Sequence, residues 1–195
     1  MRKRLSLIPL LGLAFLVVLL LFIPLLRHLG LPSANQKQAV SYDKKTFIKM
    51  VAPLAQETTK YYGIRPSLII AQASLSSNYG QTLLASKYHN LFGVKAEAGD
   101  QSVTLNNQVY IMGKWQSQAQ KFKRYSSWEK SVYDYLDQLK NGQTLDKEMY
   151  TILVSKEGYK RTAQRLQELA FEKDSQYANK LVKIIEENNL TGYDE

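Results

Sequence analysis

The chain has 195 residues and a formal net charge of +9, and it contains no cysteine. The lack of cysteine excludes disulfides and thiolate metal sites, and two histidines are too few for a multi-histidine metal centre. We therefore predict neither a metal nor a cofactor.

The first predicted element is a membrane segment. Three basic residues precede an uncharged apolar stretch of 22 residues that begins at Leu5 and ends at Leu26. Its length meets the roughly 20 residues that a membrane-spanning helix needs, and it exceeds the roughly 7–15 of a cleavable signal peptide, which is the alternative. More basic residues lie before the stretch than directly after it, which predicts a cytoplasmic N-terminus. The sequence thus predicts a single-pass protein of the cell membrane with an extracellular C-terminal domain.

Composition divides the chain into three parts. Residues 1–27 form the predicted cytoplasmic tip and transmembrane anchor, residues 28–41 a polar tether, and residues 42–195 one domain that is large enough to bury a core. The part beyond Arg27 contains all 17 acidic residues and carries about +5. A basic domain outside the cell suits an anionic wall or lipid surface, and we expect no nucleic-acid partner.

Helical periodicity predicts three helices in the first half of the domain. Apolar residues recur at helical spacing over residues 44–62, which indicates an amphipathic helix. Pro66 suits the first turn of a second helix over residues 66–78, which is apolar enough to be the central buried helix. A short third helix is predicted over residues 83–87.

The second half of the domain combines strands with helices. Residues 103–124 have strand character with a turn at Gly113, which predicts a small β lobe. Residues 126–129, Ser-Ser-Trp-Glu, have the form of a capping box and start a helix that ends near Lys140. The last predicted helices span residues 160–171 and 175–188. The predicted class is mainly α (α+β), which suits a lysozyme-like helical domain with a small β lobe and a groove between the two parts.

Four motifs in sequence order resemble those of a known family. Residues 71–80 read AQASLSSNYG and residues 90–95 read NLFGVK, while FKRYSSWEKS follows at residues 122–131 and YANKL at residues 177–181. Together they resemble the glucosaminidase family of bacterial cell-wall hydrolases, glycoside hydrolase family 73, over about residues 45–193. The resemblance implies a groove that takes the glycan strands of peptidoglycan.

The two positions that carry the reaction in this family hold no acid here. The first motif usually reads Ala-Gln-Ala-x-Leu-Glu-Ser-x-x-Gly, whose Glu is the general acid, and Ser76 occupies that position. A second acid commonly lies in a Thr-x-Glu-Tyr-x-x-Gly-x-Trp stretch, where this chain has Val109. Glycoside hydrolysis normally uses two carboxyl groups, and neither serine nor valine supplies one. We therefore hypothesise that the domain is catalytically silent.

The candidate glycan-binding residues are polar and aromatic side chains in or beside these motifs. They are Gln72, Tyr79, Asn90, Phe92, Lys95, Tyr110, Trp115, Tyr125 and Tyr177. Each has a structural alternative. The aromatic residues could pack in the core with their polar atoms hydrogen-bonded, Asn90 could cap a turn, and Lys95 could be a solvated charge.

Three functions are open from the sequence. The first is a silent domain that binds peptidoglycan strands or a protein of cell-wall synthesis or hydrolysis. The second is an active endo-β-N-acetylglucosaminidase in which Glu57 or Glu97 supplies the acid, with help from the substrate's acetamido group. The third is a membrane scaffold that binds no sugar. A carboxylate in the groove near Ser76 would favour the second function, and bulky side chains filling the groove would favour the third.

Overall fold

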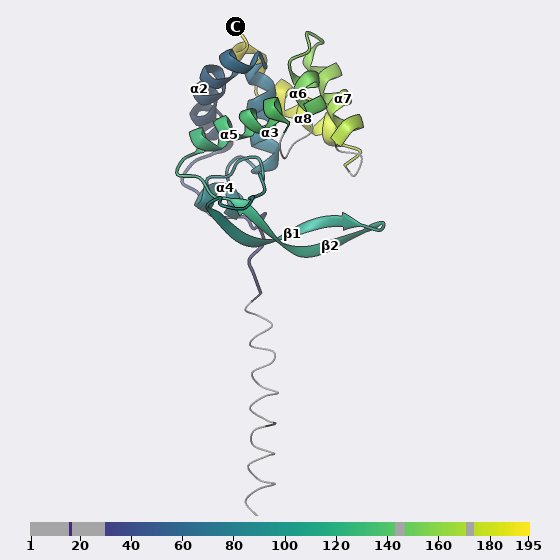
Figure 1. Ribbon diagram of the computed structural model, residues 1–195. Helices are drawn as coiled ribbons and strands as arrows, with labels where there is room; N and C mark the ends of the chain where they lie inside the picture. Colours follow the sequence, from purple (N-terminus) through teal and green to yellow (C-terminus); the bar gives the residue numbers. More distant parts are fainter. Residues whose placement is uncertain (1–15, 17–29, 143–146, 171–173) are drawn as a thin grey trace, which may run out of the picture. The chain divides into compact units, whose positions relative to one another are not determined.

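The computed structural model describes residue 16 and residues 30–142, 147–170 and 174–195 (Figure 1). The chain divides into two compact units, Met1–Pro32 and Ser33–Glu195. The predicted membrane segment lies outside the described residues except for Leu16, so the anchor stays a prediction. Among the described residues, no helix is long and apolar enough to cross a membrane.

The unit Ser33–Glu195 is mostly helical and contains one two-stranded sheet (Figure 1). Its helices are α2 (Lys44–Tyr62), α3 (Pro66–Ser76), α4 (Leu83–Tyr88), α5 (Trp128–Asn141), α6 (Lys147–Leu153), α7 (Tyr159–Ala170), α8 (Tyr177–Glu187) and the 3₁₀ helix η1 (Leu190–Tyr193). The strands β1 (Ser102–Ile111) and β2 (Lys114–Lys123) pair antiparallel as a hairpin. This arrangement confirms the predicted mainly α class with a small β lobe.

Two of the differences between the observed and the predicted helix boundaries have a clear local cause. α3 ends before residue 78 because Asn78 and Tyr79 adopt left-handed backbone angles, with φ of 48° and 55°. α5 is capped by Ser127, whose hydroxyl accepts the N–H of Lys130 at 3.3 Å, so the capping box predicted at residues 126–129 is wrong. The short elements α6 and η1 were not predicted, because each has too few turns to show a helical period.

α3 lies at the centre of the larger hydrophobic core, as predicted. Leu68, Ile69 and Ile70 are fully buried, and the helix packs against α2, α8 and η1. The N-terminus of α3 is capped from the far end of the chain. Asp194 accepts hydrogen bonds from the main-chain N–H and the hydroxyl of Ser67, both at 2.7 Å. The C-terminal residues therefore stabilise the central helix.

A second, smaller core fixes the root of the hairpin to α4. It consists of Ala34, Leu83, Leu84, Leu105 and Phe122. Leu105 of β1 and Phe122 of β2 are both nearly fully buried. The hairpin is thus attached at one end and extends from there as a long ribbon to its turn (Figure 1).

Part of the segment predicted as a tether is built into the domain. Ser33 forms a β-bridge with Asn106 of β1, and Lys37 forms one with Thr82. Ala34 is buried. The compact unit therefore begins at Ser33, ahead of the predicted boundary at residue 42. Main-chain pairing holds this segment, and a polar composition gives no indication of such pairing.

Candidate functional site

Two neighbouring hollows, of about 340 and 260 Å³, share Ser76 and Phe92 in their walls. The larger one is also lined by Gln72, Leu75, Tyr135, Asp174 and Tyr177. The smaller one is also lined by Ala34, Asn35, Thr82, Leu84, Asn90, Gly93, Asn107 and Phe122. We refer to the two hollows together as the Ser76 groove. It lies between helical residues and the hairpin, where the sequence predicts a groove.

Ser76 is the last residue of α3, and its side chain hydrogen-bonds to main-chain carbonyl groups. Its hydroxyl lies within hydrogen-bonding reach of the carbonyl oxygens of Gln72, at 2.8 Å, and of Leu91. A serine hydroxyl has one proton, so it donates to one of these carbonyls at a time. Ser76 thus joins the end of α3 to the loop after α4, and it has no acidic proton to give to a ligand.

Neutral polar groups line the hollow on the helical side. Tyr135 donates to the amide oxygen of Gln72 at 3.3 Å, and the Gln72 amide nitrogen donates to the hydroxyl of Tyr177 at 3.2 Å. Burial raises the pKa of Tyr135, and it raises that of Tyr177 to about 12, so both phenols are neutral at physiological pH. Phe92 stacks on Tyr135 with ring centroids 4.0 Å apart. The hollow therefore combines a stacked aromatic pair with uncharged hydrogen-bonding groups.

The side chain of Asn90 shapes the loop that carries Phe92. Its amide nitrogen donates to the carbonyls of Val94 and Lys123, each at 2.9 Å, and its amide oxygen accepts the N–H of Val94 at 3.0 Å. Asn90 is 1% exposed. Both amide protons are therefore used inside the protein, which matches the structural alternative for this residue, although Asn90 also lines the smaller hollow.

Val109 lies on the groove side of the hairpin. Side chains two residues apart along a strand share a face, so Val109 shares the face of Asn107, which lines the groove, and of Leu105, which is buried at the root. The residue opposite Val109 on β2 is Gln116, an amide. Both positions that lack the acid expected from the resemblance, Ser76 and Val109, are therefore on the groove side.

Asp174 is the only acidic residue among the described residues that line the Ser76 groove. Its carboxylate accepts hydrogen bonds from the Lys180 ammonium at 3.0 and 2.8 Å, and from the main-chain N–H of Gln176 at 3.1 Å. The hydrogen bonds from Lys180 are the main cause that lowers the pKa of Asp174 below its ordinary value of 3.8. Asp174 is therefore an ionised carboxylate at neutral pH, and it does not hold a proton to donate.

Sequence reasoning did not single out Asp174 or Tyr135. The signal for Asp174 is its place three residues before the YANKL motif of residues 177–181. Tyr135 is at helical spacing with the buried residues Val132, Leu136 and Leu139 of α5, and it is itself buried as well as lining the groove.

The two alternative acids lie outside the groove. Glu57 is exposed on α2, where its carboxylate accepts the hydroxyl of Tyr133 at 3.5 Å. Glu97 is exposed before β1, where its main-chain N–H donates to Asp100 at 2.8 Å. Neither lines the hollows that contain Ser76. In the described part of the chain, no group of three or more His, Asp or Glu side chains is placed to hold a metal ion.

Three further candidates also lie outside these hollows. Tyr79 is 8% exposed and packs edge-on against Phe47, with ring centroids 6.1 Å apart. Tyr125 donates its hydroxyl to Asp134 at 2.7 Å, and burial raises its pKa. Lys95 is exposed. Tyr79 and Tyr125 thus make the contacts of structural residues.

The aromatic pair of the hairpin faces the other way. Tyr110 and Trp115 are directly opposite each other in the β1–β2 register, with ring centroids 5.2 Å apart. Tyr110 neighbours Val109 in the strand, and adjacent residues point to opposite faces. The pair therefore lies on the face of the hairpin opposite to Asn107 and the groove.

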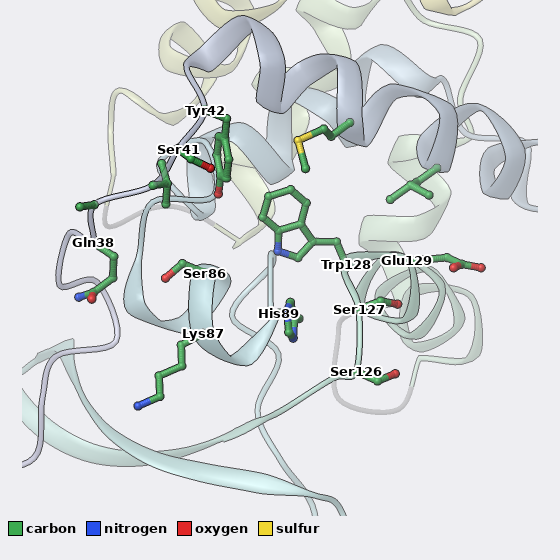
Figure 2. A pocket seen from close by; sticks show the side chains of 14 residues that line it. Gln38, Ser41, Tyr42, Ser86, Lys87, His89, Ser126, Ser127, Trp128 and Glu129 are labelled. Atoms are coloured by element: carbon green, nitrogen blue, oxygen red, sulfur yellow. The ribbon is translucent and has the colours of Figure 1, made fainter.

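A third hollow, of about 980 Å³, shares no residue with the Ser76 groove. It lies between residues 38–42, α2, α4 and the start of α5. Figure 2 shows the indole of Trp128 inside it, and this indole donates to the carbonyl of Ala85 at 2.9 Å. Glu129 is its only acidic residue among the described ones. Neither acid position of the resemblance lies there, so we take the Ser76 groove as the candidate site.

Comparison with known families gives a match over most of the chain. The family model for glucosaminidase, described as mannosyl-glycoprotein endo-beta-N-acetylglucosaminidase, matches residues 52–190. The exo-glucosaminidase LytG of Bacillus subtilis is 33% identical over 196 residues, which cover 100% of this chain and 69% of LytG. A probable N-acetylmuramidase of Lactococcus lactis subsp. cremoris is 30% identical over 80% of this chain and 36% of that protein. The chain thus spans only about a third of the lactococcal protein.

Solved structures agree with this match. The catalytic domain of the autolysin Auto from Listeria monocytogenes superposes with a TM-score of 0.69 and 34% identity, over 80% of this chain and 90% of that domain. A glycoside hydrolase domain of FlgJ from Salmonella typhimurium has a TM-score of 0.59 and 27% identity, over 75% of this chain and 98% of that domain. The helical body with its two-stranded sheet is consistent with the predicted lysozyme-like fold.

Proposed function

The chain belongs to the glucosaminidase family, a family of peptidoglycan hydrolases, and from this premise we propose that it is a catalytically silent member that binds peptidoglycan glycan strands. The observation that carries the proposal is an open groove in which no described residue is a protonated carboxylic acid. Its walls combine an aromatic stack with neutral hydrogen-bonding groups and the ionised carboxylate of Asp174, and both positions of the family's acids hold other residues.

The chemistry of the groove supports the proposed silence. Cleavage needs a carboxylic acid that protonates the leaving oxygen and a second group that attacks or activates water. Ser76 donates its hydroxyl to main-chain carbonyls, and Val109 has no polar atom. Asp174 is ionised because of its contact with Lys180, and it therefore has no proton to give to the leaving oxygen as a general acid. Among the described residues of the groove, none can therefore protonate the leaving oxygen as a carboxylic acid.

Glycan binding is supported by the groups that the groove keeps. Sugar rings pack against aromatic faces, and the stacked rings of Phe92 and Tyr135 offer apolar surface beside the amide of Gln72. The hollows are open, which disfavours a scaffold whose groove is filled by its own side chains. The alternative of an active enzyme that uses Glu57 or Glu97 has no support in the geometry, since neither carboxylate lines the groove.

The proposal places the domain at the outer face of the cell membrane. The support is the uncharged stretch from Leu5 to Leu26 and the basic residues before it. Fractionation of cells that express the full chain tests this part. The chain should stay in the membrane fraction after carbonate washing, and protease added to cells without a wall should degrade the domain. A carbonate-soluble or protease-protected chain would exclude the anchor as proposed.

A pelleting assay with insoluble peptidoglycan tests the binding. Because Ser33–Glu195 is a compact unit with its own core, it can be purified without the N-terminal segment. Phe92→Leu removes the stacked ring and keeps apolar bulk, so binding should weaken by about tenfold, as expected for an aromatic anchor. Tyr61→Leu is the matched control, since Tyr61 is 72% exposed on α2 and lines neither hollow. Equal binding by wild type and Phe92→Leu would remove the groove as the glycan site.

A further inference from the structure

The turn of the hairpin exposes an unusual amount of apolar surface. Met112 is 96% exposed, Trp115 is 59% exposed and Tyr110 is 36% exposed. These three residues, which we call the hairpin tip, lie at or beside the β1–β2 turn. Scattered exposed apolar residues are ordinary, but a methionine and two aromatic residues gathered at one projecting turn indicate a surface that meets another apolar phase.

The glycan groove does not account for this surface. Tyr110 and Trp115 lie on the face opposite to Val109 and Asn107, and Met112 is in the turn itself. None of the three lines the Ser76 groove. The side chains of the hairpin tip are therefore available while a glycan occupies the groove.

The charge beside the tip is positive. From Gln101 to Gln120 the sequence contains no acidic residue, and its one basic residue is Lys114. Lys114 is exposed and directly follows the turn. Tryptophan, tyrosine and lysine together are the side chains that favour the boundary between lipid headgroups and acyl chains, and basic residues add attraction to anionic lipids. The charge and the aromatic residues thus fit the same surface.

The attachment of the hairpin limits how far it can be from a membrane. Ser33, the first residue of the compact unit, bridges to Asn106 in the middle of β1. Only residues 27–32 separate it from the end of the predicted membrane segment, and a chain of that length reaches at most about 25 Å. From Asn106 the turn at Met112 is about 20 Å further along the strand. These two lengths permit the hairpin tip to touch the surface of a bilayer that the predicted anchor would enter.

We propose that the hairpin tip docks onto an anionic lipid bilayer, with Met112 and Trp115 entering the headgroup boundary and Lys114 meeting lipid phosphate. In the cell this docking rests on the predicted anchor of the proposed function, while docking to vesicles needs only the folded domain. Docking of the tip would fix the orientation of the Ser76 groove relative to the membrane, so that it takes glycan strands at a set height above the bilayer.

The fluorescence of Trp115 tests the proposal directly. Trp115 and Trp128 are the two tryptophans of the chain, and Trp128 is partly buried and hydrogen-bonded. Purified Ser33–Glu195 is titrated with vesicles of phosphatidylglycerol and phosphatidylcholine, and with vesicles of phosphatidylcholine alone. The expected result is a blue shift and reduced acrylamide quenching on the anionic vesicles, with much weaker changes on the neutral ones.

Variants separate the tip from general basic charge. Met112→Asn/Trp115→Thr should weaken sedimentation with anionic vesicles by at least about tenfold, because it removes the inserted side chains. Lys114→Thr should weaken it by about fivefold, which corresponds to one basic residue near an anionic surface. Both variants should fold, because Met112 and Gly113 have φ of 48° and 79°, where an Asn-Gly turn is favoured, and threonine suits a strand. Tyr61→Gln, on α2, should bind as wild type does.

Three results would overturn the proposal. They are an absent blue shift on anionic vesicles, equal vesicle binding by the Met112→Asn/Trp115→Thr variant, and a Trp115 shift produced by soluble peptidoglycan fragments instead of vesicles. The last result would assign the tip to glycan or wall polymer. The vesicle assay contains neither anchor nor glycan, whereas peptidoglycan pelleting reports on the groove, so the two proposals can fail independently.

Discussion

The hydroxyl of Ser76 lies within hydrogen-bonding reach of the carbonyl oxygen of Leu91, which joins the end of α3 to the loop that carries Phe92. The residue in the place of the family's general acid therefore supports the wall of the groove. Ser76→Ala should lower the free energy of unfolding by about 1 kcal/mol, the usual net value of one such hydrogen bond. Urea denaturation measures this value. An unchanged midpoint would show that the hydroxyl has no structural role.

Asp194 provides the cap of α3 from the end of the chain, because Arg65, at the N-cap position, makes no side-chain capping bond. Asp194→Ala should lower the free energy of unfolding by about 1–2 kcal/mol, as the loss of a helix cap does. Asp194→Asn keeps one oxygen acceptor and should cost less. Urea denaturation of the two variants checks the order. Equal stability of wild type and Asp194→Ala would mean that the C-terminal residues do not hold α3.

Asn90 should be one of the most sensitive polar positions. Asn90→Ala leaves the carbonyls of Val94 and Lys123 and the N–H of Val94 without their partner in a buried place, which should cost about 2–4 kcal/mol. Asn35→Ala is the matched control, because Asn35 is exposed and its amide makes only a 3.5 Å contact with Asn107. Thermal and urea unfolding compare the two. A loss below that of the control would contradict a structural role for Asn90.

The pair of Asp174 and Lys180 predicts a specific pH dependence. The pKa of Asp174 is lowered in the folded state, so its contribution to stability is present above its ordinary value of 3.8 and is lost as pH falls through the lower folded value. The pair is largely exposed, so the contribution should be at most about 1 kcal/mol. Asp174→Asn should thus be slightly less stable than wild type at neutral pH.

Urea denaturation of wild type and Asp174→Asn at a series of pH values measures this difference. It should shrink steadily as the pH is lowered below about 4 and should also shrink in high salt, which screens the pair. A difference that grows on acidification would show that the pKa of Asp174 is raised, and Asp174 would then become a candidate proton donor.

The helices could be predicted because their causes are local. The apolar period of α2, the proline at the start of α3 and the glycines after α2 and α5 are visible in the sequence and correspond to observed boundaries. The strands and their turn at Gly113 were equally visible. The position of residues 33–41 in the domain could not be predicted, because their main-chain bridges to Asn106 and Thr82 do not depend on side-chain composition.

The site was predictable only where a motif marks it. The groove is lined by Gln72, Ser76, Phe92 and Tyr177, which lie in the motifs. It is also lined by Tyr135 and Asp174, which come from other parts of the chain and lie in none of the motifs. For the hairpin, strand alternation already implied that Val109 and Tyr110 face opposite sides. Their positions in the motif predicted that Val109 and Tyr110 both lie beside the glycan. The strand register instead places the two residues on opposite faces of the hairpin.

A peptidoglycan digest with purified Ser33–Glu195, read by mass spectrometry for new N-acetylglucosamine reducing ends, tests catalytic silence most directly. Wild type should release none. The Ser76→Glu/Val109→Glu variant restores a carboxyl at both positions and should release ends at a rate at least about a hundredfold above the background without protein, within the range that general acid catalysis contributes. Release of new ends by wild type above the level of a control without protein would contradict a silent domain.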